Sequence, residues 1–325
     1  MENKENIMKR QIGKSDIWVT SLGFGGAPIG NIDVSPAEMS EIFQCTYESG
    51  IRYFDTAPLY GKGSSEKRIG RELAKWTRDE FVISTKVGRI LKNKQNVPNS
   101  FKVIYDYNYD GARRSLEASL ERLGLDRVDI LFCHDIDVWT HGDKQSEIFK
   151  KAIKGILPAL VELRREGVIK AFGLGVNEAD VCEQIMDLFE VDCFLLAGRF
   201  TLLEQEPLDS LLPKCLERNV SIIIGGPYNS GLLATNVRSE ATYDYKPVDE
   251  ERWKRSQKIR NICEDHGVDI RAGALQYPLR HPTVASVIPG SESLQQLKEN
   301  LGFLVHPIPF SLWSDLEKED LIRAI

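Results

Sequence analysis

The sequence predicts an α/β fold, a (β/α)8 barrel of the TIM type, built as a single domain over residues 1–325. Two observations lead to this prediction. Short apolar and β-branched runs alternate with longer stretches in which apolar residues recur at helical spacing, a pattern typical of repeated β-α-β units. No internal repeat or Gly/Ser-rich linker divides the chain, and single barrels often reach this length.

The individual elements follow from the same pattern. Residues 8–22 are expected to form a β-hairpin that plugs the barrel, and a helix is expected at the C-terminus. Eight apolar runs have the length of buried parallel strands, namely Leu22–Gly25, Tyr53–Asp55, Phe81–Thr85, Val128–His134, Ile169–Leu174, Cys193–Ala197, Ser221–Ile224 and Val284–Ile288. The amphipathic stretches between them, several opened by capping residues, predict helices over Ser35–Ser49, Ser65–Trp76, Asp110–Leu123, Gln145–Glu166, Glu178–Phe189, Leu208–Glu217 and Glu250–His266.

Two long tracts interrupt the alternation. Arg89–Tyr109 is a polar connection after the third strand, and Tyr228–Val248 is rich in Tyr, Asn, Ser and Thr and follows the seventh. Long connections in compact domains are often functional lids, and disordered insertions are the alternative. We expect these two tracts to act as lids.

The composition is that of an ordinary globular protein, with 42% hydrophobic and 28% charged residues. The net charge of -6 is spread along the chain, which argues against a nucleic-acid partner. The first residues, MENKENIMKR, are polar, and no run approaches the roughly 20 apolar residues that span a bilayer. We therefore expect a cytoplasmic protein with a small-molecule partner and no membrane association, while its oligomeric state stays open.

The cysteines indicate neither a disulfide framework nor a metal site. They are far apart, mostly inside apolar or helical runs, without a CxxC pair or a Cys/His cluster at zinc spacing. We expect reduced core thiols at all six positions, which are Cys45, Cys133, Cys182, Cys193, Cys215 and Cys263.

Three ionisable residues stand at the ends of consecutive predicted strands. Asp55, Lys86 and His134 each end an apolar run, and active sites of such barrels lie at the C-terminal ends of the strands. For any one of them alone, a salt bridge or a solvated strand end is the better explanation. On neighbouring strands they should converge, and Tyr60 follows Asp55 on the same loop and can reach the same patch.

This set of residues is suited to proton transfer. A tyrosine has an ordinary pKa near ~10 and is a poor base at neutral pH. A lysine ammonium nearby favours the phenolate, and a carboxylate beside the lysine keeps that ammonium charged and oriented. The sequence thus predicts Asp55, Lys86 and Tyr60 as a tuning relay, with a neutral His134 donating a hydrogen bond to a substrate oxygen.

Several segments resemble one known family. The run GIRYFDTAPLYGKGSSEKRIGREL from Gly50 and the run STKVG from Ser84 are similar to the signature segments of the aldo-keto reductases. Further tracts resemble the branch that contains D-threo-aldose (L-fucose) 1-dehydrogenases and pyridoxal 4-dehydrogenases, and the resemblance covers nearly the whole chain. These tracts are HDIDVWTHG, AFGLGVNE, LLAGRFTLLEQ, GGPYNSGLLA and ASVIPGSESLQQLKENL.

The resemblance implies a catalytic tetrad of Asp55, Tyr60, Lys86 and His134, with Tyr60 as the general acid/base. It also implies an NAD(P) that binds across the barrel mouth without a Rossmann domain. In agreement, the glycine-rich run GFGGAPIG from Gly23 lacks the dinucleotide fingerprint spacing.

By the same resemblance, Asn177 would hold the nicotinamide carboxamide, and the loop after the seventh strand would follow the pyrophosphate. The segment after Ile288 opens a helix, whose N-terminus suits a phosphate, although an ordinary turn explains it as well. The expected cofactor-binding residues are Gly26, Ala27, Asp55, Asn177, Gly226, Pro227, Tyr228, Asn229, Ser230, Gly231, Leu232, Ile288, Gly290, Ser291, Gln296, Glu299 and Asn300.

The cofactor is expected to be NAD rather than NADP. Members that prefer NADP tend to place a cation where this chain has Gly290 and Gln296, because a 2′-phosphate needs a cationic partner. Glu292 and Glu299 would repel a phosphate, while Lys298 and Arg271 are the substitutes that remain. Two positions also depart from the wider family pattern, Ala197 in place of a glutamine and Gly225 in place of an aromatic that stacks on the nicotinamide.

The resemblance implies NAD-dependent oxidation of an aldose of the L-fucose, D-arabinose or L-galactose type at C1 to a lactone, favoured at alkaline pH. The alternatives are a pyridoxal 4-dehydrogenase, an NADPH-dependent carbonyl reductase, a Schiff-base isomerase or aldolase, and a redox-sensing nucleotide-binding regulatory subunit. The residues expected to face the substrate are Tyr60, His134, Trp139 and Arg199, with Asp135 or Asp137 beside them unless these carboxylates cap helices.

Overall fold

Eight parallel strands form a closed barrel in the computed structural model, which describes residues 7–93 and 101–325. Adjacent strands pair in chain order, and the parallel bridges Leu22 to Val287 and Gly25 to Gly290 join the last strand to the first. All eight predicted strands are present, and the predicted (β/α)8 fold is confirmed. They are β3 (Phe24–Gly25), β4 (Tyr53–Asp55), β5 (Val82–Val87), β8 (Ile130–His134), β9 (Ala171–Val176), β10 (Cys193–Ala197), β11 (Ser221–Gly225) and β14 (Val284–Ile288).

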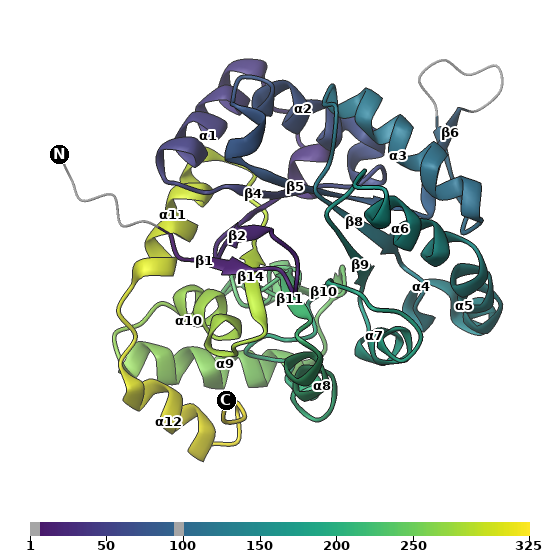
Figure 1. Cartoon of the computed structure of the whole chain (residues 1–325). Coiled ribbons are helices and arrows are strands. Elements are labelled where there is room, and N and C mark those ends of the chain that lie inside the picture. The colour runs from purple at the N-terminus through teal and green to yellow at the C-terminus, as the bar shows by residue number, and fades with distance from the viewer. Residues whose placement is uncertain (1–6, 94–100) are drawn as a thin grey trace.

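The N-terminal hairpin of β1 (Lys9–Gln11) and β2 (Trp18–Thr20) lies across one end of the barrel, in the centre of the view in Figure 1. Its buried side chains Ile12, Ile17 and Val19 belong to the same apolar cluster as Phe132 and Ile223 from inside the barrel. The hairpin therefore closes the barrel at the N-terminal ends of its strands, as predicted.

Helices surround the barrel, and a second, larger apolar cluster fills the space between helices and strands. Helix α1 begins with a capping box in which Ser35 and Glu38 satisfy each other's backbone amides. The helices are α1 (Pro36–Glu48), α2 (Ser64–Leu73), α3 (Tyr109–Leu123), α4 (Val138–His141), α5 (Gln145–Lys154), α6 (Ile156–Arg165), α7 (Ala179–Met186), α8 (Leu211–Arg218), α9 (Glu250–Asp265), α10 (Ile270–Gln276), α11 (Leu294–Val305) and α12 (Phe310–Lys318).

The single helix predicted over Gln145–Glu166 is wrong, because the structure has two helices, α5 and α6, that meet at Gly155. The backbone of Gly155 is non-helical, and a Cβ there would lie 2.4 Å from the carbonyl oxygen of Tyr107. The close approach of the chain before α3 therefore breaks the helix, which amphipathic spacing alone does not reveal.

Both long tracts contain short antiparallel hairpins. The first holds β6 (Arg89–Asn93) and β7 (Phe101–Tyr105), and residues 94–100, which also belong to the predicted lid, lie outside the described residues. The second holds β12 (Thr242–Tyr243) and β13 (Lys246–Pro247). Each tract thus brings a hairpin to the C-terminal end of the barrel strands. The action of the two tracts as lids stays a prediction.

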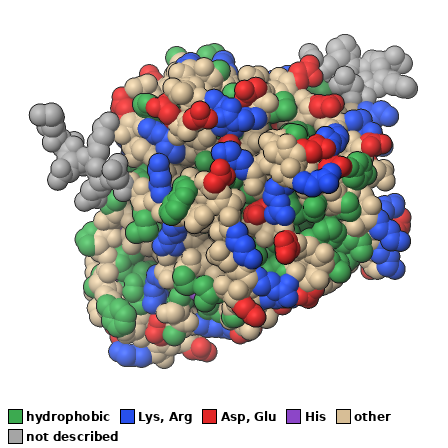
Figure 2. Space-filling model, viewed as in Figure 1, with side chains coloured by type: hydrophobic (Ala, Val, Ile, Leu, Met, Phe, Trp, Pro, Cys, Tyr) green, Lys and Arg blue, Asp and Glu red, His purple; other side chains and the backbone are tan. Residues whose placement is uncertain are grey.

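All six cysteines are free, and Cys45 alone among them is not buried. Basic and acidic side chains are mixed over the face drawn in Figure 2, without a large patch of one sign. Within residues 7–93 and 101–325, no helix combines the length and apolarity that a membrane crossing requires. The same residues hold no group of three or more His, Cys, Asp or Glu that could bind a metal ion.

Candidate active site

The four residues of the predicted tetrad lie together at the C-terminal end of the barrel. Asp55 ends β4, Lys86 lies near the end of β5, and His134 ends β8. Because β4, β5 and β8 pair directly in that order, their carboxyl ends lie side by side. Tyr60 approaches the same place from the loop after β4.

Asp55 and Lys86 form a buried ion pair. The Nζ atom of Lys86 lies 2.6 Å from Oδ2 of Asp55 and donates a second hydrogen bond to the carbonyl oxygen of Thr56 at 2.9 Å. Ser84 donates its hydroxyl to the other carboxylate oxygen of Asp55 at 2.7 Å, a contact that the sequence analysis did not anticipate. Burial raises the pKa of Asp55, against the opposing effect of Lys86.

Lys86 remains positively charged in this setting. Burial alone would lower the pKa of Lys86, but the charge of Asp55 and the neighbouring Tyr60 outweigh burial and raise it above its ordinary value. The carboxylate of Asp55 therefore performs the predicted task of keeping the ammonium charged, since an isolated buried lysine would tend to lose its proton.

Tyr60 is held beside this pair by a tight turn. The following residue, Gly61, has a left-handed φ of 57°, and a Cβ there would lie 1.8 Å from the carbonyl oxygen of Gly30, so only glycine fits. The Nζ atom of Lys86 lies 4.7 Å from the centre of the Tyr60 ring. The His134 ring stands perpendicular to it, with centroids 6.4 Å apart.

The pKa of Tyr60 is raised, not lowered. Burial raises it to about 12, although Lys86 acts in the opposite direction. Lys86 lowers the pKa of Tyr60 as predicted, but the loss of water around the hydroxyl has the larger effect and was not predicted. Tyr60 is therefore a protonated phenol at neutral pH.

His134 is neutral. Burial lowers the pKa of this histidine well below its ordinary value, and the charges of Lys86 and Arg89 lower it further. Its Nε2 atom lies 3.4 Å from Oδ2 of Asp135. Its Nδ1 atom is buried and has no hydrogen-bond partner among residues 7–93 and 101–325. A neutral imidazole can donate one hydrogen bond, as the predicted role requires.

A cavity of about 550 Å³ opens above these residues. Of the predicted site residues, Ala27, Asn177 and Trp139 line it together with Tyr60, Lys86 and His134. Two residues that the sequence analysis did not select, Arg89 and Tyr245, also line it. Both belong to the long tracts, so the only sequence signal for them was the length of those connections.

Trp139 and the two neighbouring acidic residues have distinct settings. Trp139 is 47% exposed at the cavity, and its backbone amide donates to Glu178 at 2.9 Å. Asp137 caps α4 by accepting from the amide of Thr140 at 3.0 Å and also accepts from the amide of Asn177 at 2.8 Å. The carboxylate of Asp135, by contrast, borders the cavity.

Arg199 does not line the cavity. Its two guanidinium nitrogens lie 3.0 and 2.9 Å from the two carboxylate oxygens of Asp244, in the turn between β12 and β13. The next residue in that turn is Tyr245, and both turn residues have left-handed φ angles, 48° and 60°. The structure therefore places Arg199 as the anchor of the turn that brings Tyr245 to the cavity.

The segments predicted to bind the cofactor are joined to one another. The hydroxyl of Tyr228, after β11, donates to Oδ1 of Asn300 at 2.5 Å, and Nδ2 of Asn300 donates to Ser291, after β14, at 3.1 Å. Gly290 passes so close to η1 (Pro28–Gly30) that a Cβ would lie 2.3 Å from the Pro28 ring. Ile288 is buried in β14, one strand away from Gly226 and the loop that follows it.

The loop after β11 contains four residues with positive φ angles, namely Gly226, Asn229, Ser230 and Gly231. This stretch ends at the buried Leu232. Asn229 is buried and donates to the carbonyl oxygen of Gly198 at 3.0 Å. Its Oδ1 atom has no partner among the residues that the structure describes. Gly226 and Pro227 lie between β11 and this turn, and a Cβ on Gly226 would lie 3.7 Å from the amide nitrogen of Gly198.

The cavity suits a nicotinamide. The small residues Ala27, Gly175 and Ala197 border it and leave space for a flat ring. The amide of Gly26, which directly precedes Ala27, donates to the carbonyl oxygen of Asp55 at 2.8 Å. These residues therefore fit the cofactor that the sequence led us to expect.

Of the two cations predicted near the adenosine end, Arg271 is engaged in ion pairs, whereas Lys298 is exposed on α11. Arg271 is paired with Asp269 at 2.7 Å and with Glu299 at 3.2 Å. The side chain of Gln296 accepts from the amide of Glu292 at 2.8 Å, at the N-terminus of α11. A guanidinium already shared by two carboxylates is a poor partner for an additional phosphate.

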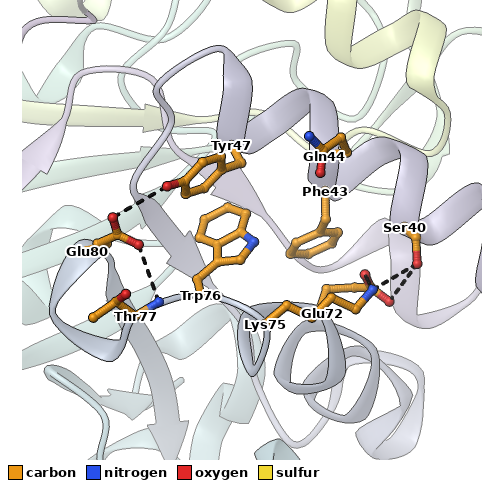
Figure 3. Close-up of a pocket in the computed structure, with 9 residues that line it drawn as sticks. All are labelled: Ser40, Phe43, Gln44, Tyr47, Glu72, Lys75, Trp76, Thr77 and Glu80. Carbon is orange, nitrogen blue, oxygen red and sulfur yellow. Dashed lines mark hydrogen bonds and ion pairs between the residues drawn. The ribbon is translucent and has the colours of Figure 1, made fainter.

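A second cavity of about 450 Å³ lies between α1 and the end of α2, on the outer ring of helices (Figure 3). Tyr47, Trp76 and Phe43 supply its aromatic walls. Its carboxylates are engaged locally, with Glu80 accepting from Tyr47 at 3.4 Å and Glu72 from Ser40 at 3.3 Å. None of the predicted site residues lines this cavity.

Comparison with known proteins agrees with this geometry. Residues 21–319 match the aldo/keto reductase family. The chain is 36% identical to a pyridoxal 4-dehydrogenase from Microbacterium luteolum, over 97% of this chain and 98% of that protein. It is 37% identical to a D-threo-aldose 1-dehydrogenase from a Pseudomonas species, over 94% and 95% respectively.

A solved structure of an aldo-keto reductase from Bacillus halodurans, in its holo form, superimposes with a TM-score of 0.75. It shares 26% sequence identity, and the alignment covers 98% of each chain. The fold, the family match and the similarity over nearly the full length agree with one another. The chain therefore belongs to the aldo/keto reductase family and is an oxidoreductase that acts on CH–OH or carbonyl groups.

Proposed function

We propose that the protein oxidises an aldose at C1 to the corresponding lactone, with NAD as the hydride acceptor and Tyr60 as the general base. The observation that carries this proposal is the position of Tyr60 at the cavity, where the centre of its ring lies 4.7 Å from Nζ of Lys86. Asp55 pairs with the same Nζ atom at 2.6 Å. The similarity to a D-threo-aldose 1-dehydrogenase supports the choice of substrate.

The residues of the site would share the reaction as follows. Neutral His134 donates a hydrogen bond to the hydroxyl oxygen on C1 and holds it near Tyr60. Tyr60, as the phenolate, takes the proton of that hydroxyl, and Lys86 stabilises the negative charge on the phenolate oxygen before the transfer. A bound nicotinamide cofactor supplies the acceptor for the hydride that leaves C1. Loss of one hydride and one proton converts the cyclic aldose to its lactone.

The residues that would hold the cofactor are those named from the sequence. Asn177 and Ala27 border the cavity near Tyr60, while the loop from Gly226 to Leu232 and the segment from Gly290 to Asn300 are linked through Tyr228. NAD is favoured over NADP because Arg271 is already paired with Asp269 and Glu299. The same pairing disfavours an NADPH-dependent carbonyl reductase.

The cavity wall supports a polyhydroxylated substrate. Arg89, Asp135 and Asn177 bring charged and polar groups to the cavity, and Trp139 offers an indole on which the apolar face of a sugar can pack. Pyridoxal is the second candidate, since its oxidation also forms a lactone and a pyridoxal 4-dehydrogenase is 36% identical to this chain. A regulatory subunit is a weaker candidate because all four tetrad residues are present and lie together at the C-terminal ends of neighbouring strands.

The test is a substrate panel with purified protein. NADH or NADPH formation would be followed by absorbance with NAD or NADP and with L-fucose, D-arabinose, L-galactose, D-glucose and pyridoxal. Oxidation of one of the first three sugars with NAD supports the proposal, while oxidation of pyridoxal alone favours the second candidate. NAD binding without any oxidation favours the regulatory subunit. A cytoplasmic location and a single-domain organisation stay predictions.

A further inference from the structure

Asp135 has an unusual backbone conformation. Its φ is 48°, in the left-handed region, which residues other than glycine seldom adopt and which persists only where the surroundings impose it. The surroundings do so here, because the carbonyl oxygen of Asp135 accepts from the hydroxyl of Tyr107 at 2.6 Å and lies 2.8 Å from Nε2 of His141. Its amide donates to Gly175 at 3.0 Å.

This conformation brings the carboxylate of Asp135 to the cavity, where its side chain is only 6% exposed. Arg89, from the start of β6, forms an ion pair with one carboxylate oxygen. The same oxygen lies 3.4 Å from Nε2 of His134. Asp135 is thus an acceptor fixed directly beside the residue that would hold the reacting hydroxyl.

Arg89, His134 and Asn177 line the cavity together with Asp135, so hydrogen-bond donors and acceptors lie close to one another in its wall. An ionised carboxylate only accepts hydrogen bonds and a guanidinium only donates them. A ligand with closely spaced hydroxyl groups, each both donor and acceptor, matches this combination.

We propose that Asp135 is a substrate-binding residue that accepts a hydrogen bond from the hydroxyl on C2, next to the reacting carbon, and so selects substrates that carry it. This inference rests on the proposed oxidation of an aldose at C1. If His134 donates to the oxygen on C1, the neighbouring carboxylate of Asp135 is the acceptor nearest to the adjacent hydroxyl. Asp135 would then distinguish 2-hydroxy aldoses from their 2-deoxy analogues.

The experiment compares D-arabinose with 2-deoxy-D-ribose, which has the same skeleton without the hydroxyl on C2. We would measure kcat/KM for the unaltered protein and for Asp135→Asn and Asp135→Gly, two replacements that tolerate a left-handed φ. For D-arabinose, kcat/KM should fall about tenfold in the Asn variant and about 10–100-fold in the Gly variant, because a hydrogen bond to a charged group is lost. For 2-deoxy-D-ribose, both variants should stay within about threefold of the unaltered protein.

Asp320→Asn is the matched control, since Asp320 also has a left-handed φ, of 54°, but is exposed in the C-terminal segment. This variant should leave kcat/KM for both substrates unchanged. Equal losses on both substrates in the Asp135 variants, or no preference of the unaltered protein for D-arabinose, would overturn the inference while leaving aldose oxidation in place. If the unaltered protein oxidises no aldose at all, the proposed function itself fails and the inference fails with it.

Discussion

Lys86 and Asp55 form an ion pair of 2.6 Å in which the side chains are 1% and 3% exposed. Breaking such a pair from one side leaves a buried charge without compensation. We expect Asp55→Asn to lower the free energy of unfolding by about 3–5 kcal/mol and to reduce turnover strongly, because an uncompensated Lys86 tends to lose its proton. Chemical denaturation and steady-state kinetics measure the two effects.

Ser84→Ala provides the control for that variant. It removes one hydrogen bond to Asp55, of 2.7 Å, but keeps the charge pair, so it should cost only about 1 kcal/mol. If both variants destabilise the protein equally, the charge of Asp55 is not what stabilises this part of the barrel.

Tyr60→Phe removes the proposed base without altering the packing of the ring. Turnover should fall by about 10²–10⁴-fold, the usual contribution of a general acid or base, while the dissociation constant for NADH, measured by fluorescence, should remain almost unchanged. Substantial remaining turnover would mean that another group takes the proton.

The pKa of Tyr60, about 12 because of burial, sets the direction of the pH dependence. The phenolate is the active form for oxidation, and below the pKa its population rises about tenfold per pH unit. The rate of oxidation should therefore rise with pH across the alkaline range. The pKa of His134 is lowered by burial, so this residue stays neutral and should add no inflection there. A pH-independent rate of oxidation would contradict the assignment of Tyr60.

The ion pair between Arg199 and Asp244 has two contacts, of 3.0 and 2.9 Å, and holds the turn that carries Tyr245. Lysine cannot reproduce the two-pronged contact, so Arg199→Lys should raise KM for the substrate roughly threefold to tenfold and leave kcat nearly unchanged. Asp244→Asn should behave alike. Lys151→Ala, which breaks an exposed pair with Glu147 on α5, is the control and should change neither constant. A fall in kcat at constant KM would contradict a role in positioning the turn.

Cofactor preference should respond to one added cation. Gln296→Arg places a guanidinium at the N-terminus of α11, where Arg271 is already paired with Glu299. We expect kcat/KM for NADP to rise about tenfold, because a charge-assisted contact with the 2′-phosphate becomes available. Gln296→Leu, which is of similar size and uncharged, should not produce this gain. If the arginine variant gains nothing, the 2′-position of the cofactor lies elsewhere.

The order of the barrel could be predicted from the sequence because each strand is buried on both faces and therefore reads as a continuous apolar run. The ionisable residues Asp55, Lys86 and His134 stand out for the same reason, since each ends such a run. The break between α5 and α6 could not be predicted, because it depends on the approach of the Tyr107 backbone to Gly155, which is distant in the sequence.

By itself, the sequence determined the eight-stranded barrel, the hairpin plug and the four residues that meet at its upper end, because these depend on local periodicity and on the order of the strands. Only the tertiary structure decided the protonation state of Tyr60 and the residues of the cavity wall. The high pKa of Tyr60 comes from burial, and the contacts of Arg89 with Asp135 and of Arg199 with Asp244 join segments 46 and 45 residues apart. Burial and long-range pairing are properties of the folded chain, and no local pattern records them.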